Sequence, residues 1–185
     1  MPFNSTDYGN RVAEILALDQ DGNRLIPLVS GGCASKRAEP LLIKQAASDL
    51  FPVARAPEPA LAGLWLYFSG ADECHRIVQE LGSAEASFWH AILHRQEPDA
   101  GNASYWFGRV GSHPAFIPLH EHAVQILARY PKVRFRLSAP WDPFAFIELC
   151  ETARQQPGSE SEMAALEIQR AEWQILFDYC ARRDS

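Results

Sequence analysis

Helix-start and helix-stop signals recur along almost the whole chain, and they constrain its fold more than any other feature. Ser83 is placed to cap one apolar segment, and Asp142-Pro143 gives the start signal of another. Ser159-x-x-Glu162 is a capping box in front of a last amphipathic segment. The sequence therefore predicts an all-α fold of six or seven helices with a short extended N-terminal segment.

The chain has 185 residues, a length that one domain with a single core accommodates. We expect one compact domain over residues 1–185. Near the N-terminus, Asp21-Gly22 separates two apolar segments, so a hairpin and a helix followed by an extended piece both fit, and the second is preferred. The helices expected after it cover about residues 40–51, 62–81, 84–97, 105–110, 118–130, 143–155 and 160–182.

Composition narrows the expected partners and location. The formal net charge is −6, and Lys132–Arg136 is the nearest approach to a basic stripe, so nucleic acid is not an expected partner. No apolar run approaches the ~20 residues of a spanning helix, and the first residues show no secretory signal. The four cysteines, Cys33 among them, form no CxxC pair and fit reduced thiols. We therefore expect a cytoplasmic protein without membrane association.

Histidines gather in the middle of the chain, where the predicted helix over 84–97 carries two of them. At about 100° per residue, His90, His94 and Glu97 share one narrow stripe beside an apolar arc. Two histidines at positions i and i+4 can share a metal ion. The pattern is not the HExxH of zinc peptidases, because position 91 is Ala.

The preceding helix predicted over 62–81 adds two further polar groups. His75 lies at the edge of its apolar arc, and Asp72, three residues earlier, is placed to orient the imidazole ring. The short connection makes the two helices neighbours, so these groups would face His90 and His94. We expect a pocket for a small polar molecule, with a divalent transition metal held by His75, His90, His94 and Glu97. The candidates for acid/base catalysis are Asp72, His75 and Glu97.

The segment after this stripe supplies the expected ligand-binding residues. Asp99 and Asn102 lie in a turn that would close the pocket. Trp106 either packs in the core or stacks on a ligand. Arg95 and Arg109 either clamp an anionic ligand or, as preferred, pair with Glu97 or Asp99. We take Asp99, Asn102, Trp106 and Arg109 as ligand-binding candidates.

A long motif in this region resembles a family of bacterial proteins without an established activity. Residues 88–102 read FWHAILHRQEPDAGN and residues 105–114 read YWFGRVGSHP, similar to the family's YWHAIxHRxEPDxxNxxYWFRRVGxHPxF. Upstream, LFPVARAPEPALAGLWLYFSGADECH is similar as well, so the resemblance covers about 48–118. Gly108 departs from the family, in which a basic residue is expected. The resemblance implies that the family pattern includes Asp72, His75, His90, His94, Glu97, Asp99, Asn102, Arg109 and His113.

Two other interpretations stay open. In the first, the protein is a non-enzymatic binding or interaction module, and its histidines and carboxylates form a structural hydrogen-bond network. In the second, it is a homo-oligomer whose last helix forms the interface, although core packing of that helix fits the same pattern. The residues of that helix face are Leu166, Trp173, Leu176, Phe177 and Cys180. No role follows from the sequence for His113 or Cys33.

Overall fold

The computed structural model describes residues 3–31 and 35–183, and Cys33 lies outside them. Within these ranges the structure is helical and has no β-strand, which confirms the predicted all-α class. The described ranges contain ten α-helices, more than expected, because the helices predicted over 40–51 and 62–81 are each divided in two. A helix also forms before Asp21-Gly22, as preferred from the sequence. The elements are η1 (Ser5–Tyr8), α1 (Asn10–Leu16), η2 (Gln20–Gly22), α2 (Glu39–Leu42), α3 (Ala47–Leu50), α4 (Pro57–Tyr67), α5 (Ala71–Val78), α6 (Ala84–Gln96), α7 (Ala100–Val110), α8 (Phe116–Leu127), α9 (Pro143–Arg154) and α10 (Glu160–Ala181).

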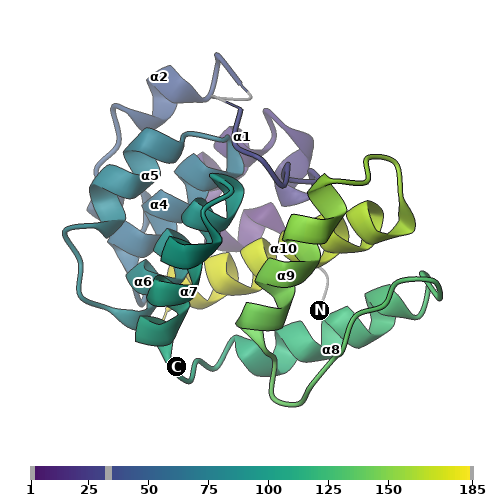
Figure 1. Ribbon diagram of the computed structural model, residues 1–185. Coiled ribbons are helices and arrows are strands. Elements are labelled where there is room, and N and C mark those ends of the chain that lie inside the picture. Colours follow the sequence, from purple (N-terminus) through teal and green to yellow (C-terminus); the bar gives the residue numbers. More distant parts are fainter. Residues whose placement is uncertain (1–2, 32–34, 184–185) are drawn as a thin grey trace.

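The last helix, α10, runs through the middle of the molecule, and α4, α8 and α9 pack against it (Figure 1). The indole Nε1 of Trp173 donates to the carbonyl of Gly63 at 2.7 Å and so joins α10 to α4. Trp173, Leu176, Phe177 and Cys180 are buried in the chain's own core, which explains the apolar face of this helix. Across the described ranges, no helix combines the length and the apolarity needed to cross a bilayer.

A break divides the helix predicted over 62–81. α4 ends at Tyr67 and α5 begins at Ala71, so the prediction of one continuous helix is wrong. Ser69 adopts a φ of 61°, and the next residue, Gly70, donates its N–H to the carbonyl of Trp65 at 2.8 Å. A Cβ on Gly70 would lie 2.6 Å from the Trp65 ring, so only glycine fits there. The break lets α4 bury nearly all its residues while α5 turns one face to α6.

The predicted caps form, with one difference before α7. Ser83 accepts the N–H of Ala86 at 3.1 Å and starts α6 as expected. Asp99 accepts the N–H of Asn102 at 3.1 Å and caps α7. Residues 100–102 are therefore the first turn of a helix and not a loop over a pocket, because the Asp99 carboxylate satisfies a free amide at that helix start.

Candidate metal centre

Three histidines from two neighbouring helices come together between α5 and α6. His75 of α5 lies with its ring centroid 4.7 Å from that of His90 and 5.8 Å from that of His94, both on α6. One ligand nitrogen from each lies within 4.8 Å of the others. Among the residues the structure describes, this histidine trio is the one group of three or more His, Cys, Asp or Glu side chains placed to hold a metal ion.

His90 is the most enclosed member of the histidine trio. It is 3% exposed, and neither of its ring nitrogens has a hydrogen-bond partner. Trp106 of α7 stacks on its ring with centroids 3.9 Å apart and planes 19° apart. Burial lowers the pKa of His90 to about 4, helped by the neighbouring His94 and His75. The ring is therefore neutral at pH 7, the form that binds a metal.

His94 stands beside a carboxylate at the end of the same helix. Its Nδ1 lies 3.1 Å from Oε2 of Glu97, although the alignment falls short of a hydrogen bond. The rings of His94 and His90 lie 4.9 Å apart and within 17° of parallel. The stripe predicted on α6 is thus present, and Glu97 supplies negative charge at its outer end.

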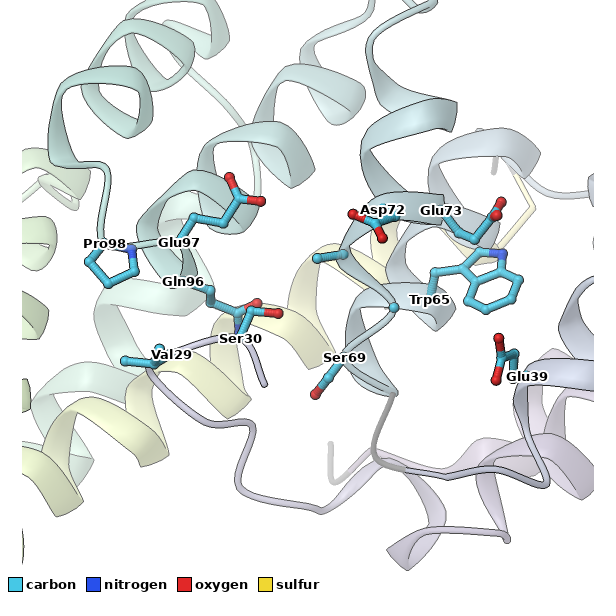
Figure 2. Close-up of a pocket in the computed structure, with 12 residues that line it drawn as sticks. Val29, Ser30, Glu39, Trp65, Ser69, Asp72, Glu73, Gln96, Glu97 and Pro98 are labelled. Atoms are coloured by element: carbon cyan, nitrogen blue, oxygen red, sulfur yellow. The ribbon is translucent and has the colours of Figure 1, made fainter. Parts of the chain in front are cut away.

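Two surface hollows lie near the histidine trio, and His75 is the one member of the trio that lines either of them. The first, which we call the histidine hollow, has a volume of about 360 Å³ and is lined by Asp72, His75, Arg76, Gln79 and Glu97. The second, the acidic hollow, has about 580 Å³ and shares Asp72 and Glu97 with the first (Figure 2). The other residues that line it are Val29, Ser30, Glu39, Trp65, Ser69, Gly70, Ala71, Glu73, Gln96 and Pro98.

The predicted catalytic candidates lie at this surface, but one expected contact is missing. Asp72 is exposed and lines both hollows. In the described part of the chain, no hydrogen bond joins Asp72 to His75, so the expected orientation of that ring by Asp72 is not found. Asp72 faces the hollows because it lies in the first turn of α5, while His75 turns toward α6.

The ligand-binding candidates divide between the histidine trio and the surface of α7. Trp106 reaches the trio through its stack on His90. Asp99 and Asn102 bond to each other at 2.6 Å and line neither hollow. The bonds from the Asn102 amides lower the pKa of the Asp99 carboxyl. Arg109 is exposed, with its guanidinium 5.4 Å from the Trp106 ring.

His113 belongs to a different part of the core. Its ring packs among Phe88, Phe116 and Tyr179, at centroid distances of 4.7 to 6.2 Å. Its Nδ1 accepts the N–H of Ala115 at 3.1 Å. Burial lowers the pKa of His113. Its contacts fit a packing role and place it outside the trio.

Sequence reasoning missed the residues that complete the acidic hollow. Ser30 donates its N–H to the carbonyl of Gln96 at 2.8 Å, which brings residues 29–30 beside the end of α6. Glu39 lies at the start of α2, and no periodic pattern in the sequence connects it to Trp65.

The chain was also compared with protein-family models, curated proteins and solved structures, and none of them matches it.

Proposed function

We propose that the protein binds a divalent transition metal of the zinc type through His75, His90 and His94. The observation that carries this proposal is the environment of His90, whose two ring nitrogens are buried without a hydrogen-bond partner. A buried polar group left unpaired costs about 1–3 kcal/mol. A metal ion bound within the histidine trio would satisfy one of the two nitrogens, and imidazole is a preferred ligand of zinc.

The spacing of the histidine trio supports this proposal. Nitrogens bound to one tetrahedral zinc ion lie about 3.3 Å apart, given Zn–N bonds of about 2.0–2.1 Å. The ligand nitrogens here lie within 4.8 Å, so a small rotation of the side chains brings them into range. His94 has Glu97 beside its Nδ1, which leaves its Nε2 for the metal. Glu97 then orients the imidazole of His94 without binding the metal itself, as carboxylates do in many metal sites.

The proposal extends to a small polar ligand bound next to the metal. Three protein ligands leave a fourth position of a tetrahedral ion for water or substrate, as in catalytic zinc sites. His75 lines the histidine hollow, so that position is reached from solvent. Asp72 and Glu97, at the edge of the same hollow, are the groups we propose for proton transfer in a hydrolytic reaction.

Two further proposals concern the setting of the protein. Cys74, Cys150 and Cys180 are buried free thiols, which supports a reducing compartment such as the cytoplasm. The motif over residues 88–114 supports membership of the bacterial family that it resembles.

Metal content and metal affinity test the proposal directly. Purified protein is stripped with a chelator, titrated with zinc, manganese and iron(II), and analysed by elemental analysis after dialysis. We expect about one zinc per chain and a higher melting temperature, because a ligand that binds only the folded state stabilises it. The double variant His90→Ala with His94→Ala should lose this zinc.

The matched control is His122→Ala, since His122 is an exposed histidine on α8 away from the trio. This control should bind zinc as the wild type does. A wild-type protein that retains no metal, with a melting temperature unchanged by all three ions, would overturn the proposal. A third outcome would favour the structural-network interpretation. In it, the wild type binds no metal, and the double variant is much less stable than the wild type when both are measured in chelator.

A further inference from the structure

Trp106 of α7 lies nearly flat against the imidazole of His90, with the two ring centroids 3.9 Å apart and the planes 19° apart. The indole is half-buried and lines neither the histidine hollow nor the acidic hollow. A ligand bound in either hollow therefore does not stack on Trp106. Any part that the indole plays in the site acts through His90.

His90 has no hydrogen bond that holds its ring in one orientation. Histidines that bind metals usually donate their second ring nitrogen to a carboxylate or a carbonyl, which fixes the ring. His94 has the carboxylate of Glu97 beside its Nδ1, at 3.1 Å. Both nitrogens of His90 are buried without a partner, so a different contact has to restrain this ring.

A stacked neighbour restrains an imidazole without occupying either of its nitrogens. The indole of Trp106 covers a face of the His90 ring, whereas the two nitrogens lie on the edge of that ring. Rotation of His90 about its Cβ–Cγ bond would turn this edge into the indole, because the centroids are only 3.9 Å apart. The stack thus limits the rotation and leaves the ligand nitrogen free.

The same stack should be stronger when a metal is bound than when the site is empty. A divalent ion draws electron density from an imidazole ligand and leaves its ring electron-poor. The face of an indole is electron-rich and attracts positive charge. Because only an interaction that differs between two states changes the balance between them, the contact of Trp106 with His90 should raise the affinity for the metal.

We propose that Trp106 is a positioning residue of the metal site, which holds the His90 imidazole in the orientation that binds the ion and stabilises the metal-bound ring through its π face. This inference rests on the proposed function, because His90 is taken as a metal ligand. It gives Trp106 a role different from both core packing alone and contact with a ligand, the two roles that the sequence left open.

Substitutions of Trp106 separate the aromatic face from mere bulk. Trp106→Leu keeps an apolar side chain without a π face, and Trp106→Phe keeps the face. The zinc Kd is measured on full-length, metal-stripped protein by competition with a chromophoric chelator. We expect Trp106→Leu to raise the Kd about tenfold or more, and Trp106→Phe to stay within about threefold of wild type. The matched control is Tyr105→Leu, which removes a 57% exposed ring from the same helix and should bind zinc as the wild type does.

Cobalt(II) in place of zinc gives a readout that a loss of packing alone would not change. Its visible absorption depends on the number and arrangement of its ligands. Trp106→Leu should shift the cobalt spectrum relative to wild type, and Trp106→Phe should restore it. Circular dichroism and thermal melts in chelator show whether each metal-free variant is folded. Trp106→Ile repeats the comparison if Trp106→Leu is not folded.

Three results would overturn the inference while leaving the metal proposal in place. They are a zinc Kd of Trp106→Leu within about threefold of wild type, an unchanged cobalt spectrum in that variant, and a loss of affinity in Trp106→Phe as large as in Trp106→Leu. Failure of the metal proposal gives a different result, because the wild type itself then binds neither zinc nor cobalt. That result would overturn both proposals together.

Discussion

The guanidinium of Arg95 binds the carboxylate of Glu172 inside the core, where both side chains are 0% exposed. Arg95 Nη1 lies 3.2 Å from Glu172 Oε1, and Arg95 Nη2 donates to Gln169 Oε1 at 3.3 Å. The guanidinium also lies 4.5 Å from the ring centre of Phe146. Arg95 directly follows His94 near the end of α6. The ion pair between Arg95 and Glu172 therefore attaches this end of α6, with the metal candidates on it, to α10.

Replacement of Arg95 alone should destabilise the protein strongly. Arg95→Met leaves the Glu172 carboxylate buried without a partner, and we expect a loss of about 3–5 kcal/mol in the free energy of unfolding. Urea denaturation followed by circular dichroism measures it. The double variant Arg95→Met with Glu172→Leu should recover part of the loss, because no charge is then left in the core. A single variant within about 1 kcal/mol of wild type would show that this pair does not matter for stability.

Two glycine-to-alanine changes should shift stability in opposite directions. At Gly63, an added Cβ would lie 2.7 Å from the indole of Trp89, a buried ring with little room to move, so Gly63→Ala should cost about 1–3 kcal/mol. At Gly108, on the exposed face of α7, a Cβ meets no atom within 4 Å. Gly108→Ala should therefore stabilise by about 0.5–1 kcal/mol through helix propensity. Thermal melts measure the stability of both variants. A Gly63→Ala variant more stable than wild type would contradict the close packing of Gly63 in α4 against Trp89 in α6.

The burial of His113, like that of His90, should make stability depend on pH below neutrality. Its pKa is lower in the folded chain than the value of about 6.5 expected when unfolded. The unfolded chain then binds more protons below pH 6.5, so stability is complete above that pH and falls as the pH decreases through the window beneath it. Melting temperatures between pH 7.5 and 5, measured in chelator, should show this fall.

His113→Asn tests the assignment to this residue. Asparagine keeps an acceptor oxygen for the N–H of Ala115 and removes the titrating group. The variant should lose less stability than wild type on acidification, while His122→Asn, at an exposed position, should follow the wild-type curve. Identical slopes for His113→Asn and wild type would rule out a contribution from His113 and leave His90 as the source.

Local patterns in the sequence predict much of this fold because their causes are local. Ser83 and Asp142 cap the helices that they were expected to cap, since capping needs only a side-chain oxygen and an amide two or three residues ahead. The break at Ser69 and Gly70 could not be predicted in this way. It depends on the ring of Trp65 packing against Gly70, and the apolar spacing continues through it undisturbed.

The same division holds for the candidate site. His90, His94 and Glu97 share a face because helix geometry places residues three and four apart together. The partner of Arg95 could not be foreseen, because Glu172 is 77 residues away and the choice between it and Glu97 depends on how α6 meets α10. Likewise, no spacing rule brings Ser30 and Glu39 to the acidic hollow, which forms only when the N-terminal segment folds over α4 and α6.

Glu97→Gln should weaken zinc binding without abolishing it. Its carboxylate lies 3.1 Å from His94 Nδ1, and a neutral amide there loses the charge that orients and polarises the imidazole. We expect a 10- to 100-fold rise in the zinc Kd, the range found when such outer carboxylates are changed. Competition with a chromophoric chelator measures the Kd, and Glu80→Gln serves as the control because Glu80 lines neither hollow. Unchanged affinity in Glu97→Gln would remove Glu97 from the metal site and leave the three histidines as its whole protein contribution. Complete loss of zinc would instead make Glu97 a direct ligand, with the fourth coordination position closed.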